Sequence, residues 1–210
     1  MNGLFVVVEG PNGVGKTTTA RLLADRLTIC GCDVRPTSEP TPTAWGRLIR
    51  SCEGELPARA LALAVAADRA AHVVREIQPA LSAGAVVVSD RYLPSSLVLQ
   101  RLDGLTLNEI WRYNTAALRP SVTFYLEDDP DVLVSRLKER STRSRLERLG
   151  SPARELELYG RAYEFLGRRG WRQARVDCRG LGPEQVVTAM LSRIELLHPH
   201  ERNIWTCSKF

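Results

Sequence analysis

Several features that define other protein classes are missing from this 210-residue sequence. Its longest apolar runs, at residues 4–8 and 83–88, are far shorter than the ~20 residues that cross a bilayer. Its three histidines and five cysteines include no CxxC pair and none of the spacings of a zinc site. The sequence therefore predicts no membrane contact and no Cys/His metal centre, and it offers no nucleophile with an obvious histidine partner.

The first residues have no basic flank, and Glu9 interrupts their apolar run, so we expect no secretory signal and a cytoplasmic location. With 44% hydrophobic and 25% charged residues, the composition is that of an ordinary globular protein. We expect one domain over residues 1–197 and a C-terminal tail over residues 198–210, which have no periodic pattern.

Basic residues are in modest excess, with a net charge of +5 and a pI near 9.2. Seven lysines and arginines against two acids lie between residues 136 and 154, so the excess is concentrated in one segment. Such a segment favours a clamp on a small phosphorylated molecule over a nucleic-acid interface. We therefore expect no nucleic-acid partner.

Apolar runs of strand length alternate with patterns of helical period along the chain. We expect strands at residues 4–8, 33–35, 85–89, 122–126 and 174–177, and helices at 17–27, 57–78, 106–118, 130–139, 153–166 and 182–197. This alternation predicts an α/β fold, a parallel sheet with helices on both faces. The helix at 57–78, bounded by Pro57 and Pro79, is apolar around most of its circumference, which fits either burial or contact with a second subunit.

A phosphate-binding motif lies between the first expected strand and helix. Residues 10–17 read GPNGVGKT and match GxxxxGK[ST]. Glycines let backbone N–H groups curl around phosphate, Lys16 reaches the β- and γ-phosphates, and the Thr17 hydroxyl can bind Mg²⁺. The predicted nucleotide-binding residues of this loop are Gly10, Asn12, Gly13, Val14, Gly15, Lys16, Thr17 and Thr18. Since the guanine-reading motif Asn-Lys-x-Asp is absent, we expect a small kinase that uses ATP with Mg²⁺.

Asp90 and Arg91 follow the strand expected at residues 85–89. At the carboxyl end of a buried strand beside the phosphate loop, Asp90 can hold Mg²⁺ together with Thr17. Arg91 can face both the donor and the acceptor phosphates with its bidentate guanidinium. The competing interpretation is an ion pair that only stabilises the end of the strand.

A basic segment at about residues 140–153 joins two expected helices. A loop of this composition can close over ATP, exclude water and deliver an arginine to the transferred group. Arg140, Arg143 and Arg145 are the candidates, with Arg145 as the catalytic one beside Lys16 and the Asp90–Arg91 pair. The competing interpretation is a solvated basic face of a helical hairpin.

As a set, these residues resemble the thymidylate (dTMP) kinases, within the nucleoside monophosphate kinase group of P-loop kinases. The resemblance covers about residues 5–197 and is carried in order by residues 9–18, 39–40, 46–50, 67–69, 90–92, 95–96, 100, 118–126 and 129–130. It implies a five-stranded parallel sheet, ATP–Mg²⁺ as donor, a pyrimidine deoxynucleoside monophosphate as acceptor, most of all dTMP, and a homodimer.

The resemblance also implies roles for single residues on the acceptor side. Arg50 and Arg91 would grip the acceptor phosphate, Arg69 would read a pyrimidine carbonyl, and further base contacts would come from Ser96 and Gln100. The substrate-binding residues that it implies are Asn12, Glu39, Arg50, Val65, Arg69, Arg91, Ser96 and Gln100.

Departures from the family pattern also fall on the acceptor side. Val65 replaces an aromatic residue that would stack on the base, Asn12 replaces a carboxylate of the phosphate loop, and Leu99 replaces a tyrosine. Ser38 and Arg101 are two further departures. We therefore expect an acceptor pocket looser than that of the family.

Two alternatives stay open. In a nucleoside kinase Glu39 would act as general base, because a nucleoside hydroxyl must lose a proton whereas a phosphate is already ionised. A nucleotide-binding module without catalysis is the second alternative, and the complete set of Lys16, Thr17, Asp90 and Arg91 argues against it.

Overall fold

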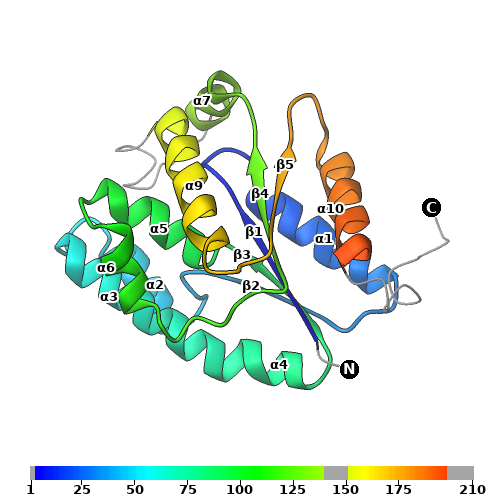
Figure 1. Ribbon diagram of the computed structural model, residues 1–210, viewed down its shortest axis with the longest axis horizontal. Helices are drawn as coiled ribbons and strands as arrows, with labels where there is room; N and C mark the ends of the chain where they lie inside the picture. Colours follow the sequence, from blue (N-terminus) through cyan, green and yellow to red (C-terminus); the bar gives the residue numbers. More distant parts are fainter. Residues whose placement is uncertain (1–2, 140–150, 198–210) are drawn as a thin grey trace.

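The computed structural model describes residues 3–139 and 151–197. Their strands form one sheet in the order β2-β3-β1-β4-β5, and each neighbouring pair is parallel (Figure 1). The strands are β1 (Leu4–Glu9), β2 (Val34–Ser38), β3 (Val86–Asp90), β4 (Val122–Glu127) and β5 (Gln173–Asp177). The predicted α/β fold with a five-stranded parallel sheet is confirmed.

Helices cover both faces of this sheet. Their bounds are α1 (Lys16–Ile29), α2 (Ala44–Ser51), α3 (Ala58–His72), η1 (Val73–Ile77), α4 (Gln78–Ser82), α5 (Leu93–Leu102), α6 (Leu107–Tyr113), α7 (Pro130–Lys138), α9 (Pro152–Gly167) and α10 (Pro183–Leu197). In Figure 1, α1 and α10 lie on one side of the sheet, and α3, α5, α6 and α9 lie on the other.

Strand β1 feeds two separate cores because successive side chains of a strand point to opposite faces. Leu4, Val6 and Val8 pack in the core that includes residues of α1 and α10. Phe5 and Val7 pack in the core with residues of α3, α5 and α9. Burial on both faces explains why the run is continuously apolar.

The helix expected at residues 57–78 continues beyond Pro79. Helix α3 leads into the π-helical turn η1, and α4 then runs to Ser82. Pro79 lies in the first turn of α4, where the missing N–H and fixed φ of proline are tolerated. The expectation that Pro79 ends the helix was therefore wrong.

Two helices escape the sequence patterns, and one is shorter than expected. Seven of the ten residues of α5 are buried, so it has no polar face to reveal its period. Helix α2 begins at a Thr43 cap, whose hydroxyl accepts a hydrogen bond from the Gly46 N–H at 3.2 Å. Helix α6 ends at Tyr113 rather than at residue 118.

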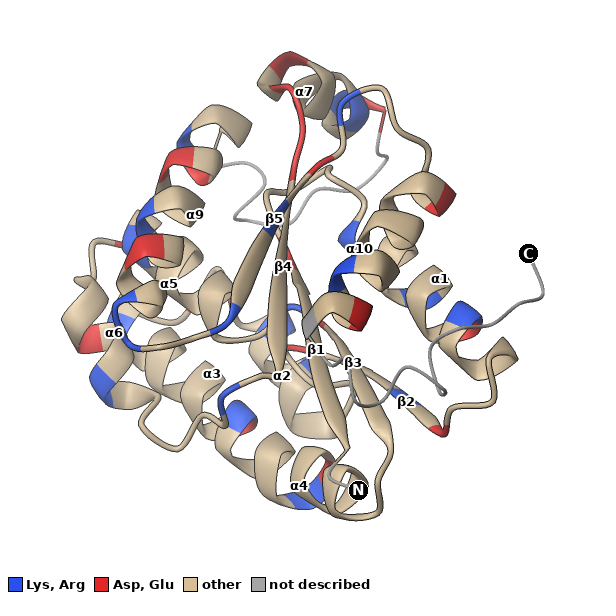
Figure 2. Cartoon of the chain, turned by 45° about the vertical axis from the view of Figure 1, so that its right-hand side comes forward, with Lys and Arg blue, Asp and Glu red and all other residues tan. Residues whose placement is uncertain are grey.

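The part of the chain that the structure describes includes no helix long and apolar enough to span a membrane. Figure 2 shows acidic and basic residues interspersed along α9. The expected tail at residues 198–210 and most of the expected lid lie outside the described residues.

Candidate active site

The predicted phosphate loop forms the connection between β1 and α1. Gly10, Gly13 and Gly15 have φ angles of 141°, 88° and 97°, which favour glycine. At Gly10 space is also lacking, because a Cβ atom would lie 2.5 Å from the Leu126 carbonyl oxygen. The backbone therefore curls as a phosphate cradle requires, and α1 begins directly after it at Lys16.

Lys16 is only 5% exposed and lies across the loop that it follows. Its Nζ donates to the carbonyl oxygens of Gly10 and Pro11, at 2.8 Å each. Burial and then the nearby Arg91 guanidinium lower the pKa of Lys16 to about 7. An ammonium group in such a place gains strongly from an arriving anion, as expected of a phosphate-binding lysine.

Thr17 and Asp90 meet as predicted, because β1 and β3 pair in parallel with Val8 opposite Asp90. The Thr17 hydroxyl donates to Asp90 Oδ2 at 2.5 Å. Asp90 Oδ1 is buried and accepts no hydrogen bond from the residues that the structure describes. A hydroxyl beside a carboxylate with a free oxygen fits Mg²⁺, which protein sites usually hold through one or two side chains plus phosphates.

Arg91 has a φ of 73°, an uncommon value for a residue other than glycine. Its backbone N–H donates to the Val8 carbonyl oxygen at 3.0 Å. Its Nη1 donates to Ser95 Oγ at 3.2 Å, and its Nη2 donates to Asn12 Oδ1 at 2.7 Å. The guanidinium therefore lies between the phosphate loop and the start of α5.

A buried carboxylate fixes the start of α5 against β1. Glu9 Oε1 accepts hydrogen bonds from the backbone N–H groups of Tyr92 and Ser95 at 2.8 and 3.0 Å. Its Oε2 accepts from Ser95 Oγ at 2.7 Å and from the Tyr159 hydroxyl at 3.1 Å. Burial raises the pKa of Glu9, and Arg91 opposes this effect. Glu9 thus fixes the positions of Arg91 and of the start of α5.

A pocket opens beside Arg91 between α3 and α5. The residues that line it are Glu39, Pro40, Glu53, Leu61, Val65, Arg69, Arg91, Tyr92, Ser95, Ser96, Leu99, Gln100 and Asp103. Six of the residues expected to bind the acceptor are among them: Glu39, Val65, Arg69, Arg91, Ser96 and Gln100. Arg50 does not line the pocket, but its side chain donates a hydrogen bond to the carbonyl oxygen of Pro40, a residue that does.

Arg69 is 2% exposed and is held on several sides. Its Nε donates to Glu39 Oε2 at 2.7 Å, its Nη2 donates to Ser96 Oγ at 3.0 Å, and its Nη1 donates to Asn114 Oδ1. Its guanidinium also lies 5.3 Å from the ring centroid of Tyr92. Sequence reasoning missed Asn114, because no local pattern joins it to Arg69.

Glu39 has hydrogen bonds on both of its carboxylate oxygens. While Oε2 faces Arg69, Oε1 lies 3.0 Å from Nδ1 of the buried His72. His72 Nε2 in turn lies 2.7 Å from the Thr37 hydroxyl. His72 was also missed, and the only available signal was its position one turn after Arg69 on the same helix.

Comparison with known proteins decides between the families that share such a loop. Residues 8–158 match the family model described as thymidylate kinase. The chain is 41% identical over 166 residues to a probable thymidylate kinase of Pyrococcus abyssi, covering 75% of the chain and 81% of the relative. The chain belongs to the thymidylate kinase family.

Other members of this family match over similar or longer spans. A probable thymidylate kinase of Pyrococcus horikoshii is 36% identical over 206 residues, with coverage of 94% of the chain and 93% of the relative. The thymidylate kinase of Xanthomonas euvesicatoria pv. vesicatoria is 37% identical over 168 residues, with coverage of 76% and 74%. Membership of the thymidylate kinase family confirms the predicted resemblance and the prediction of a nucleotide kinase.

Some of the predicted site residues of this thymidylate kinase family member lie together in the structure, and others lie outside the described residues. Loop residues 10–18 and the Asp90–Arg91 pair lie together at the carboxyl ends of β1 and β3. Arg140, Arg143 and Arg145 lie outside the described residues. Glu155, at the start of α9, contacts the loop although no sequence signal separates it from an ordinary acid in the first turn of a helix.

Proposed function

We propose that this chain transfers the γ-phosphoryl group of ATP to the 5′-phosphate of dTMP, which yields ADP and dTDP. An oxygen of the acceptor phosphate forms the new bond to phosphorus, and the bond to the bridging oxygen of ADP breaks. The observation that carries the proposal is Arg91, which joins the phosphate loop to the pocket through Asn12 and Ser95. A phosphate acceptor in this pocket would lie next to a donor in the loop.

On the donor side, backbone N–H groups of the loop would bind the phosphates of ATP, with Lys16 at the β- and γ-phosphates. These groups belong to Gly10, Gly13, Val14, Gly15, Lys16, Thr17 and Thr18. The backbone N–H of Asn12, also predicted to bind ATP, donates instead to Glu155 Oε2 at 2.7 Å. Thr17 and Asp90 would hold the magnesium ion, which screens negative charge on the phosphates. The catalytic residues would be Lys16, Asp90, Arg91 and Arg145.

On the acceptor side, Arg91 and Arg50 would bind the phosphate of dTMP with charged hydrogen bonds. The base would lie against Val65, with Arg69 and Ser96 at its polar edge. Gln100 Oε1 is buried and accepts no hydrogen bond from the described residues, so it is available to the N–H of a pyrimidine. The amide is otherwise held by a bond from Nε2 to Ser96 Oγ at 3.4 Å.

The nucleoside kinase alternative requires Glu39 to accept a proton from the substrate. Its two oxygens are already engaged by Arg69 and His72, and the side chain is buried. A general base must reach the hydroxyl that it deprotonates. The occupied carboxylate therefore supports an acceptor that is already ionised, a nucleoside monophosphate.

The lid, the subunit arrangement, the domain bounds and the location belong to the same proposal. Residues 140–153 would close over ATP, with Arg140 and Arg143 at its phosphates. Leu63 on α3 and Val74 on η1 are 48% and 65% exposed, which supports a homodimer through this part of the surface. A single domain over residues 1–197 and a cytoplasmic location stay predictions.

A coupled assay of ADP release tests the acceptor. The panel contains dTMP, dUMP, dCMP, UMP, CMP, dGMP, AMP and free thymidine, with the Lys16→Met variant as the control for contaminating kinases. We expect dTMP to have the highest kcat/KM, followed by other pyrimidine monophosphates. Preference for free thymidine would establish the nucleoside kinase, and a purine monophosphate as best acceptor would contradict the base-reading roles of Arg69 and Gln100.

A further inference from the structure

Glu155 is a buried acid in the first turn of α9, and the functions assigned so far do not use it. Its side chain is held by Asn12 of the phosphate loop, 143 residues earlier in the chain. Glu155 Oε2 accepts from the Asn12 backbone N–H at 2.7 Å, and Oε1 accepts from Asn12 Nδ2 at 3.0 Å. In Figure 1, the first turns of α9 lie beside the connection from β1 to α1.

The chemistry of the three groups determines how the Asn12 amide is oriented. An ionised carboxylate only accepts hydrogen bonds, and a guanidinium only donates them. The Asn12 amide lies between Glu155 and Arg91, so its NH₂ group must face Glu155 and its oxygen must face Arg91. With Glu155 only 1% exposed, water does not compete for these bonds as it would at the surface.

We propose that Glu155 is a positioning residue that holds the Arg91 guanidinium in place through Asn12. The carboxylate of Glu155 fixes the Asn12 amide, and the amide oxygen accepts a hydrogen bond from Arg91 Nη2 at the edge of the acceptor pocket. The inference rests on the proposed function in one respect, the role of Arg91 at the acceptor phosphate.

An exchange of the amide and the acid tests this arrangement. In Glu155→Gln, the introduced NH₂ group faces one of the two N–H donors of Asn12, so at least one bond is lost. In Asn12→Asp, the introduced carboxylate lies against Glu155, and the two acids repel each other. In the double variant, the carboxylate at position 12 accepts from Arg91 and from the amide at position 155, whose oxygen accepts the backbone N–H. All three hydrogen bonds and the net charge are then restored.

The readout is kcat and the KM values for ATP and for the acceptor, measured beside the melting temperature of each variant. We expect each single variant to lose at least about tenfold in kcat, as expected for a disrupted charged hydrogen bond, and the double variant to return to within about threefold of the unmodified protein. The matched control is Glu157→Gln, the same change two residues later on α9. Glu157 is exposed and pairs with Arg154 and Arg161, so its kcat should not change.

A purely structural role would lower the melting temperature of Glu155→Gln while leaving kcat per folded molecule unchanged, and this result would overturn the proposal. A double variant no faster than the slower single variant would overturn it too. If Glu155→Gln does not fold, the comparison of Asn12→Asp with the double variant decides, and a gain of less than about threefold in kcat refutes the coupling.

The series is run with the acceptor that the unmodified protein prefers. A wrong acceptor assignment then appears in the unmodified protein, whereas a wrong role for Glu155 appears only as missing recovery in the double variant. An unmodified protein that phosphorylates no acceptor would overturn both proposals.

Discussion

Two glutamates of this protein each contact two basic side chains. One of them, Glu39, lies in the interior, and the other, Glu157, lies at the surface. Glu39 lies between Arg69 and His72, and all three side chains are almost fully buried. Glu157 lies between Arg154 and Arg161, where each side chain is about half exposed. Replacement of each glutamate by alanine therefore removes the same kind of contact in two different surroundings.

The expected effects differ because Glu39→Ala leaves the Arg69 guanidinium buried without its counter-charge. Breaking a buried ion pair by removal of one partner costs about 3–5 kcal/mol, whereas exposed pairs contribute about 0–1 kcal/mol. Against a total stability of roughly 5–15 kcal/mol for a domain, Glu39→Ala should remove a large part. Glu39→Gln keeps one acceptor for Arg69, so it should cost about 1–3 kcal/mol.

Urea unfolding followed by tryptophan fluorescence measures these differences, since Trp171 is buried in the core beside Tyr92. We expect the order Glu39→Ala, then Glu39→Gln, then Glu157→Ala in loss of unfolding free energy, at equal m-values. The KM for the acceptor should rise in the Glu39 variants because Arg69 loses its fixed position. If Glu39→Ala costs no more than Glu157→Ala, Glu39 does not stabilise Arg69, and the argument fails.

Three further substitutions test separate parts of the site. Lys16→Met should lower kcat by ~10²-fold or more with an unchanged circular dichroism spectrum, and an unchanged kcat would contradict its assignment. Gly46→Ala should cost about 1–3 kcal/mol in urea unfolding, because its Cβ would lie 2.1 Å from the Thr41 carbonyl oxygen, and no loss would contradict this packing. Val65→Phe should lower the KM for dTMP by up to about tenfold by stacking; an unchanged KM would place the base elsewhere.

The sheet could be predicted well because strands that are buried on both faces have continuous apolar runs in the sequence. Strands β1 and β4 are buried on both faces along most of their length, and residues 4–8 of β1 form the continuous apolar run that such a strand favours. Helix α5 was missed for a related reason. It is so thoroughly buried that polar Ser95 and Ser96 belong to its interior side, which removes the contrast between faces on which periodicity depends.

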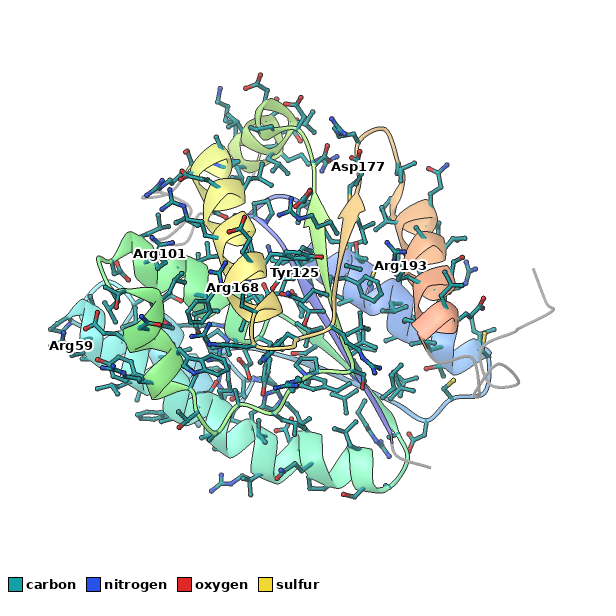
Figure 3. All side chains as sticks on the ribbon, in the orientation of Figure 1. Arg59, Arg101, Tyr125, Arg168, Asp177 and Arg193 are labelled. Carbon is teal, nitrogen blue, oxygen red and sulfur yellow. The ribbon has the colours of Figure 1, made fainter. Side chains whose placement is uncertain are left out.

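The donor side of the site could be predicted because its groups are close in the sequence. One loop of eight residues carries most of the groups that we propose for the donor phosphates, and parallel pairing of β1 with β3 brings Asp90 to Thr17. By contrast, the aromatic contacts of Tyr125, a residue labelled in Figure 3, join residues that are far apart in the sequence. This strand residue meets Tyr159 and Tyr163 of α9, a contact that only the folded chain reveals.

Contacts on the acceptor side join residues that are far apart in the sequence. Arg69 meets Asn114 across 45 positions, and Glu39 meets His72 across 33. Neither pair forms a motif, because each partner alone is an ordinary polar residue of a helix or a loop. A sequence can therefore suggest which residues face a substrate, while the residues that hold them in place emerge only from the structure.

The support of Arg91 places a condition on the phosphate loop. Asn12 lies between a guanidinium and the carboxylate of Glu155, so a second carboxylate at position 12 would face Glu155 without a donor between them. The loop can carry an acid there only when position 155 does not. In relatives that keep this geometry, we expect an acid at position 12 to occur together with a neutral residue at position 155. An alignment in which both positions are commonly acidic would contradict the argument, because two buried acids would then share one arginine.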